Sequence, residues 1–418
     1  MGPFMRSSTG RWVSGADFFD REAELDVLES RVRGRNHVLL TGQRRMGKTS
    51  ILRELGRRLE GDGWVFLFVD VEGADGPEDA IADIAQATHP YRPISSRFAT
   101  GMRRWLSDKV EEVGASQFRL KVRAGLNAGS WRRYGKRLLS DCAKQERPVL
   151  LVIDEVPIFL KRMLERDGSA TRVDEFLSWL RATILALGEN SPVLILSGSI
   201  GLDPLVRRLR IPDRINHLDP FRLGPWDRET SVACFERLAE SHELRVEVGV
   251  AGAVHDALGL GIPQHVQSFF ARLREHATMQ GRHRVTVADV AEVYRNGLLG
   301  PSGQSDLVHY ETRLREAFDD AGHSLAMEIV AEAAVEGVFT PVAERSLAAL
   351  YGGLMEDVAV RIADVLEVLV HDGYLEAGED GFRFQSRLLK DWWTARFRDH
   401  HVALEERLES SGADGNAR

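Results

Sequence analysis

The sequence has few of the residues on which several protein classes depend. Only two cysteines, Cys142 and Cys234, occur among 418 residues. They are too few and too isolated for a disulfide framework or a zinc site, so we expect buried free thiols. No run of about 18 uninterrupted apolar residues occurs. The opening residues MGPFMRSSTGRW also lack the apolar segment of a signal peptide. These features predict a cytoplasmic protein with no membrane partner.

The net charge of −8 is distributed unevenly along the chain. Residues 91–140 contain 12 Lys and Arg against 3 Asp and Glu, whereas residues 310–418 contain 11 against 22. The two segments could dock on each other, within one chain or between chains, or both could be solvated faces. Length and composition otherwise suit a globular protein of two or three domains.

The most informative motif is an apolar run followed by Gly42-x-x-x-x-Gly47-Lys48-Thr49. Residues 37–40 predict a buried strand, and apolar residues at helical spacing follow the motif. Terminal glycines let backbone N–H groups approach a polyphosphate, Lys48 places a charge on the outer phosphates, and Thr49 offers a hydroxyl to Mg²⁺. The motif therefore predicts ATP or ADP as ligand. The residues expected at the nucleotide are Gly42, Gln43, Arg44, Arg45, Met46, Gly47, Lys48, Thr49 and Ser50.

A second motif supplies what hydrolysis requires. The apolar run Val149 to Ile153 ends in Asp154 and Glu155. Asp154 would hold Mg²⁺ through water, and Glu155 would polarise the attacking water as a general base. Such an acidic pair can also cap the following helix. With a phosphate loop upstream, it indicates an ATPase of the additional-strand class.

Weaker signals extend the candidate site. Ser197 or Ser199, at the end of the fourth predicted strand, would lie between the loop and the acidic pair and sense phosphate or water, unless it caps a helix. Arg214 could reach a neighbouring chain's γ-phosphate, unless it is a surface residue. Pro263 could press on the adenine or ribose, although Gly-x-Pro most often marks a turn and a helix start.

The predicted architecture is α/β, a P-loop NTPase core whose parallel sheet is flanked by helices, followed by a helical lid and a winged helix. Within the core, alternating apolar and polar residues from Phe118 to Leu126 predict a half-exposed or edge strand. The expected ranges are a flexible leader at 1–16, the core at 17–225, the lid at 226–300, a linker at 301–305, the winged helix at 306–402 and a disordered tail at 403–418.

Taken together, these motifs resemble the STAND group of P-loop NTPases, in particular its archaeal-type ATPase branch, over residues 17 to about 398. The resemblance implies an ATP-driven switch whose core, lid and winged helix close around ATP and reopen with ADP, often controlling self-assembly. It also implies that Phe19 and Arg21 lie by the base and Pro263 at the lid contact. The matching segments are residues 19–25, 41–50, 152–157, 197–199, 261–263 and 384–393.

The sequence departs from that branch in two places. Asp213-Arg214 stands where the branch often has Gly-Arg, and neither an effector domain nor a long repeat is visible. A signal or an effector would therefore have to come from another chain.

Three functions are compatible with these features. The first is a slow, regulated ATPase switch that controls a partner protein or its own assembly, for example in prokaryotic defence or signalling. Such a switch could form a homo-oligomer. The second is a DNA-acting ATPase, origin-recognition-like or a transposition-type loader, that binds through the basic segment 92–137. The predicted recognition helix, residues 358–371, is too acidic to bind a duplex. The third is a nucleotide-bound structural subunit, which the pair Asp154 and Glu155 disfavours.

Overall fold

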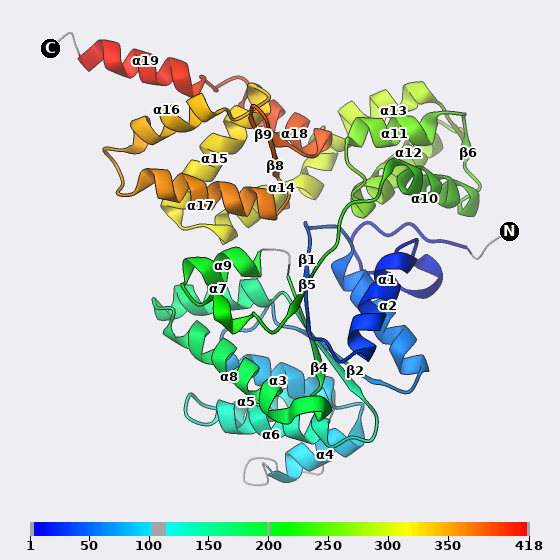
Figure 1. Ribbon diagram of the computed structural model, residues 1–418. Coiled ribbons are helices and arrows are strands. Elements are labelled where there is room, and N and C mark those ends of the chain that lie inside the picture. The colour runs from blue at the N-terminus through cyan, green and yellow to red at the C-terminus, as the bar shows by residue number, and fades with distance from the viewer. Residues whose placement is uncertain (1–3, 102–113, 199–200, 416–418) are drawn as a thin grey trace. The chain divides into compact units, whose positions relative to one another are not determined.

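The computed structural model describes residues 4–101, 114–198 and 201–415 (Figure 1). They form two compact units. The core unit comprises Val13–Gly42 and Lys48–Leu223. The C-terminal unit comprises Met1–Trp12, Gln43–Gly47 and Gly224–Arg418. The tip of the phosphate loop, Gln43–Gly47, therefore packs with the C-terminal unit.

A five-stranded parallel sheet forms the centre of the core unit, in the order β2-β3-β4-β1-β5. Because β4 lies between β1 and β3, the predicted additional-strand arrangement is confirmed. The fifth strand was not predicted, since it is four residues long, mostly exposed and contains a proline. The strands are β1 Val38–Thr41, β2 Val65–Asp70, β3 Val149–Asp154, β4 Val193–Ser197 and β5 Asp219–Arg222.

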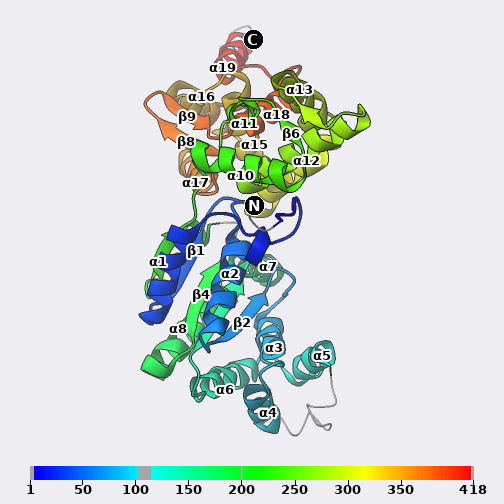
Figure 2. The same ribbon diagram turned by 90° about the vertical axis from the view of Figure 1, so that its right-hand side faces the viewer.

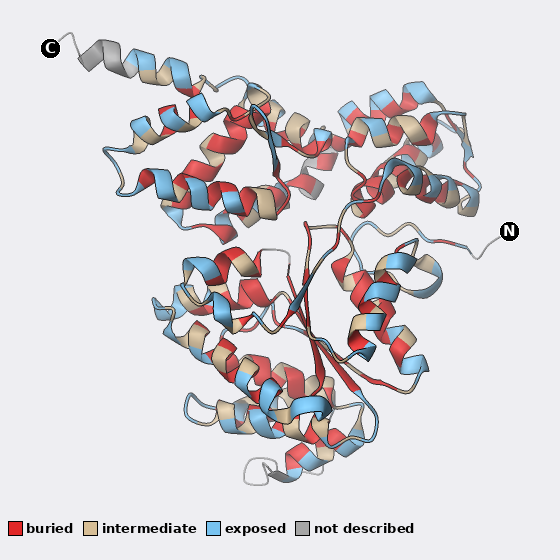
Figure 3. Ribbon diagram, viewed as in Figure 1, coloured by how far each residue is buried: buried red, intermediate tan, exposed pale blue. Residues whose placement is uncertain are grey.

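Helices cover both faces of this sheet because successive strand residues point to opposite sides. Leu67, Leu151 and Leu194 belong to a large apolar core with helices α3 to α9, while α1 and α2 lie on the other face (Figure 1). Strands β1, β3 and β4 are buried along most of their length (Figure 3). The helices are α1 Glu22–Arg33, α2 Lys48–Gly61, α3 Pro77–Ala87, α4 Arg92–Gly101, α5 Ala115–Gly125, α6 Trp131–Ala143, α7 Val156–Asp167, α8 Thr171–Leu187 and α9 Leu202–Arg208.

The edge strand predicted from Phe118 to Leu126 is wrong, because this segment is helix α5, packed beside α3 (Figure 2). Its buried residues Phe118 and Val122 are one helical turn apart. Arg119 and Arg123, also one turn apart, form ion pairs with Asp83 and Asp79 on α3. The alternating pattern arose because charged residues interrupt the apolar stripe, and contacts with α3 decide in favour of the helix.

Helix α2 approaches β2 closely at Gly56. A Cβ atom added there would lie 2.3 Å from Cε1 of Phe66. We expect Gly56→Ala to lower the free energy of unfolding by about 1–3 kcal/mol because the ring has to move in a packed core. Gly61→Ala, at the end of the same helix with no atom within 4 Å of the new Cβ, should instead be neutral or stabilising. Urea unfolding of both variants measures the difference, and equal effects would contradict this packing.

Residues 226–300 of the C-terminal unit, the range expected to form a lid and called the lid below, are mainly helical. In the described part of the chain, no helix is long and apolar enough to cross a membrane.

The predicted linker at 301–305 is wrong, because Pro301 opens helix α14 Pro301–Ala317, in which Leu307, Tyr310 and Leu314 are buried at helical spacing. The lid comprises α10 Arg228–Ser241, α11 Val250–Leu258, α12 Pro263–Met279, α13 Val287–Val293, a π-helical turn Tyr294–Leu298, and the short parallel strands β6 Arg245–Val246 and β7 Arg284–Val285.

Three helices and an antiparallel hairpin follow, in the order expected for a winged helix. We call α15 to α18 the helix–hairpin region. The predicted disordered tail is wrong for its first part, since α19 packs through the buried Leu404 and through Arg407, which donates to Glu328 (2.6 Å). The elements are α15 Asp320–Val335, α16 Pro341–Tyr351, α17 Val358–His371, β8 Leu375–Gly378, β9 Gly381–Phe384, α18 Arg387–Phe397 and α19 Leu404–Gly415.

The leader predicted to be flexible is held at both ends. Met5 is buried in the C-terminal unit, where its N–H donates to Ser241 Oγ (3.1 Å). In the core unit, the N–H groups of Val13 and Gly15 donate to Ser50 Oγ (3.0 Å) and Glu54 Oε2 (2.8 Å) on α2. These backbone N–H groups of the leader thus donate to side chains far away in sequence. No local sequence pattern reveals such partners.

Candidate nucleotide site

The base of the phosphate loop connects β1 to α2 in the core unit. Lys48 is 7% exposed, and its ammonium donates to the carbonyl of Gly42 (2.7 Å). A Cβ atom at Gly42 would lie 2.6 Å from the carbonyl oxygen of Leu223, so only glycine fits there. Gly47 has a φ of +88°, a conformation that favours glycine. The two glycines of the motif are thus required for different reasons, and together they place Lys48 at the first position of α2.

Three elements converge on the carboxylate of Asp154 at the end of β3. Thr49 Oγ1, in the first turn of α2, donates to Asp154 Oδ2 (2.8 Å), and Ser197 Oγ, at the end of β4, donates to Oδ1. Asp154 is 4% exposed. Carboxylate and hydroxyl oxygens are the hard donors that Mg²⁺ takes, so the group fits this ion. The structure brings together these three predicted residues, whereas Ser199 lies outside the described residues.

Glu155 has an unusual backbone conformation. Its φ of 59° places it in the left-handed region, where it precedes the first residue of α7, and its N–H donates to Asp154 Oδ1 (3.1 Å). For a residue other than glycine this conformation costs on the order of 1–3 kcal/mol and is common at functional sites. Here it makes the abrupt turn from β3 into α7 at the carboxyl edge of the sheet.

A further carboxylate lies beside Asp154. Asp70 ends β2 and is its direct neighbour in the parallel register of β2 and β3. Partial burial and the nearby charges of Asp154 and Glu72 raise the pKa of Asp70. The guanidinium of Arg53, on α2, stacks 3.7 Å above the ring of Phe68 on β2. The sequence could have indicated Asp70 as a site residue, because it is an acidic residue that ends an apolar strand. No sequence pattern indicates that Arg53 lies over Phe68.

The tip of the phosphate loop makes its contacts within the C-terminal unit. Gln43 is 4% exposed, and its amide donates to the carbonyl of Gly373 (2.9 Å), between α17 and β8. Arg45 has a φ of 70° and donates to His309 Nε2 on α14 (2.8 Å). These contacts give the tip side-chain partners more than 260 residues away in sequence, which the motif itself does not predict.

A buried histidine lies near the same arginine. His265, in the first turn of α12, approaches the hydroxyl of Tyr310 with its Nε2 (3.2 Å). Burial, and secondarily the charge of Arg45, lower the pKa of His265 to about 3, so the ring is neutral at ordinary pH. The predicted lid residue Pro263 is the first residue of α12. The start of α12 therefore belongs to the packed interior of the C-terminal unit.

The other predicted residues are placed less directly. Arg21 is buried at the start of α1 and forms an ion pair with Glu24 (2.5 Å); Phe19 precedes it in a non-helical segment. Arg214 pairs with Asp174 on α8 (2.6 Å) and with Asp213. These two partners do not belong to the phosphate site, and the action of Arg214 on a neighbouring chain stays a prediction.

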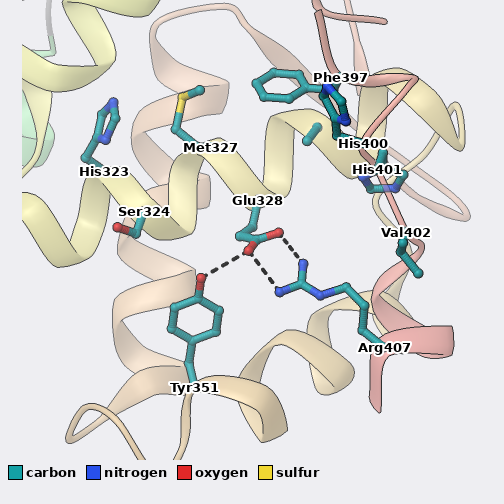
Figure 4. A pocket seen from close by; sticks show the side chains of 11 residues that line it. His323, Ser324, Met327, Glu328, Tyr351, Phe397, His400, His401, Val402 and Arg407 are labelled. Atoms are coloured by element: carbon teal, nitrogen blue, oxygen red, sulfur yellow. Dashed lines mark hydrogen bonds and ion pairs between the residues drawn. The ribbon is translucent and has the colours of Figure 1, made fainter. Parts of the chain in front are cut away.

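A pocket of about 650 Å³ in the C-terminal unit is separate from these motifs. In it the carboxylate of Glu328 accepts hydrogen bonds from Tyr351 and Arg407 (Figure 4). These bonds fasten α19 to α15 and α16. The lining residues are His323, Ser324, Met327, Glu328, Ala331, Tyr351, Phe397, His400, His401, Val402 and Arg407.

Three possible metal ligands also meet in the lid, at His276, Asp289 and Glu292. Arg282 donates to Asp289 (2.8 Å), and Thr286 forms a capping box with it at the start of α13. The buried carboxylate of Asp289 is thus already bonded to the guanidinium of Arg282 and to the helix cap, so these three side chains have a structural role.

Comparison with known proteins agrees with this geometry. Residues 17–195 match the family model described as AAA ATPase domain. Among solved structures, a Walker-type ATPase of Pyrococcus abyssi has a TM-score of 0.57 at 19% identity, covering 93% of this chain and 98% of that chain. The ORC2 protein of Aeropyrum pernix, in ADPNP–ADP complexes, has a TM-score of 0.55 at 14% identity, covering 94% and 95%. These structures share the fold of the chain.

A curated relative matches over a shorter range. The chain is 22% identical over 284 residues to the ATP-dependent zinc metalloprotease FtsH of Thermus thermophilus. The match covers 61% of this chain and 43% of that protein. The chain thus spans less than half of that relative's length. Residues 17–195 thus resemble an AAA ATPase domain, and the chain shares the fold of these solved structures.

Proposed function

We propose that this chain is an ATPase of the AAA+ type that acts as a molecular switch, in which bound nucleotide changes the contacts that the tip of the phosphate loop makes within the C-terminal unit. The change would control a partner protein or the assembly of the chain with itself. Hydrolysis would reset the switch, and the rate would be slow and regulated.

The observation that supports this proposal is the pair of contacts at the loop tip. A phosphate loop binds polyphosphate by turning its backbone N–H groups toward it. The side chains of Gln43 and Arg45 are bonded to Gly373 and His309. A ligand that favours another arrangement of the loop must weaken these bonds, and this difference in free energy is what a switch requires.

The residues around Asp154 would carry out hydrolysis. Thr49 and Asp154 would hold Mg²⁺, which supplies charge stabilisation at the phosphates. Lys48 would bind the outer phosphates, and Glu155 would accept a proton from the attacking water. Ser197, bonded to Asp154, would keep that carboxylate oriented and lie where it can register the outer phosphate.

Hydrogen exchange of the full chain tests the switch. We expect ATP with Mg²⁺ to speed amide exchange around Gly373 and around His309, because the loop releases its partners. Lys48→Met should abolish the effect, whereas Lys144→Met, at an exposed lysine of the core unit, should retain it. Unchanged exchange throughout the C-terminal unit, with ATP bound, would refute the proposal.

A DNA-acting ATPase is the second candidate, favoured by the order of elements in the helix–hairpin region. Its electrostatics argue against it, since Arg119 and Arg123 are already paired with acids on α3, and the sole arginine of α17, Arg361, pairs with Asp319 (3.4 Å). Duplex affinity that falls steeply with salt and disappears on neutralising Arg119, Lys121 and Arg123 would establish this candidate instead.

A further inference from the structure

The face of α2 that covers β2 carries Arg53 next to the metal-holding group. Gly56 lies over Phe66, and one turn closer to the phosphate loop Arg53 lies over Phe68 (3.7 Å). Phe66, Phe68 and Asp70 are alternate residues of β2, so they share one face of the strand. Successive turns of α2 therefore lie over successive residues of this face, and the first turn of α2 lies beside Asp70.

The same guanidinium is close to Asp154. Arg53 follows Thr49 by four residues, so the two share a face of the helix, and Thr49 bonds to Asp154 Oδ2. Asp154 and Asp70 are direct neighbours in the sheet. The charge of Arg53 interacts with both carboxylates. The stacking on Phe68 orients the plane of the guanidinium.

We propose that Arg53 is a positioning residue that balances the charge of Asp70 and thereby sets how strongly the site at Asp154 and Thr49 holds a divalent cation with ATP. This inference rests on the proposed ATP and Mg²⁺ site. Without the guanidinium, the charge of Asp70 beside Asp154 would be uncompensated, so we expect the cation to bind more tightly. With it, the net charge of Arg53, Asp70 and Asp154 equals that of a single carboxylate.

The test compares ATP binding by the full chain with Mg²⁺ and with EDTA, using a fluorescent ATP analogue. The ratio of the two dissociation constants measures the coupling between cation and nucleotide. We expect Arg53→Gln to raise this ratio about tenfold, since one positive charge is removed from a partly buried site. Arg53→Lys, which keeps the charge, should change it less than about twofold, and Asp70→Asn should lower it.

Two further variants separate charge from structure. Arg57, one turn further along α2, is 58% exposed and pairs with Glu54 (2.5 Å); Arg57→Gln should leave the ratio unchanged. The double variant Arg53→Gln with Asp70→Asn should return to the parent ratio, because both charges are removed together. A merely structural role would not produce this compensation.

Each result decides the question. Equal shifts of ATP affinity with and without Mg²⁺, or an Arg53→Lys variant that behaves like Arg53→Gln, would overturn the role of Arg53. If Arg53→Gln does not fold, as judged by circular dichroism, two other variants still test the proposal. The charge role predicts a nearly unchanged ratio for Arg53→Lys and a lower ratio for Asp70→Asn, whereas a structural role predicts no lower ratio for Asp70→Asn. Failure of the parent chain to bind ATP under either condition would instead overturn the proposed function.

Discussion

Glu155→Gln is expected to reduce ATP turnover by about 10²–10⁴-fold while ATP affinity stays within about twofold of the parent value. The amide cannot accept the proton of the attacking water, but it has nearly the shape of the carboxylate. The backbone of Glu155 is fixed by its position between β3 and α7 and by its N–H bond to Asp154. The substitution should therefore leave Asp154, Thr49 and Ser197 in place.

Single-turnover phosphate release and equilibrium binding of ATP measure the two effects separately. Glu165→Gln is the matched control, because Glu165 lies on α7, the helix that Glu155 begins, and its side chain is 63% exposed. It should hydrolyse ATP at the parent rate. Parent-like turnover by Glu155→Gln would exclude the residue as the base, and loss of ATP binding would show that it has a structural role.

The central part of the fold could be predicted from the sequence because its signals are local. Apolar runs such as Val149 to Ile153 are strands buried on both faces, and the loop between Gly42 and Gly47 has a steric requirement for glycine that the motif records. The carboxyl ends of neighbouring parallel strands meet at one edge of the sheet. That rule alone places Ser197 near Asp154, as the structure confirms.

Elements that depend on distant partners could not be predicted in this way. Helix α5 is determined by Asp79 and Asp83 on α3, and the leader by side chains on α2 and in the lid. In the site, the contact of Gln43 with Gly373 joins residues 330 positions apart. Arg53 reads as an ordinary surface residue of an amphipathic helix, and its stacking on Phe68 of β2 is visible only in the structure.

Lys48→Met is expected to abolish the stabilisation of the chain by ATP. A ligand present at 100 times its dissociation constant stabilises the folded protein by about 2.7 kcal/mol, which raises the unfolding temperature measurably. On the proposed function Lys48 binds the outer phosphates, so its loss should leave no shift at the same ATP concentration. Differential scanning fluorimetry of the full chain with and without ATP and Mg²⁺ measures this, and Lys144→Met, at a side chain 67% exposed, should shift like the parent.

The unfolding temperature without ATP distinguishes lost binding from lost folding. Lys48 is buried, and its ammonium has the carbonyl of Gly42 as a partner. Burial of an ammonium group carries a desolvation cost, which an apolar side chain of similar length avoids. Lys48→Met should therefore melt at or above the parent temperature when no nucleotide is present. A lower melting temperature would mean that Lys48 supports the fold itself, and an ATP shift equal to that of the parent would remove this lysine from the nucleotide site.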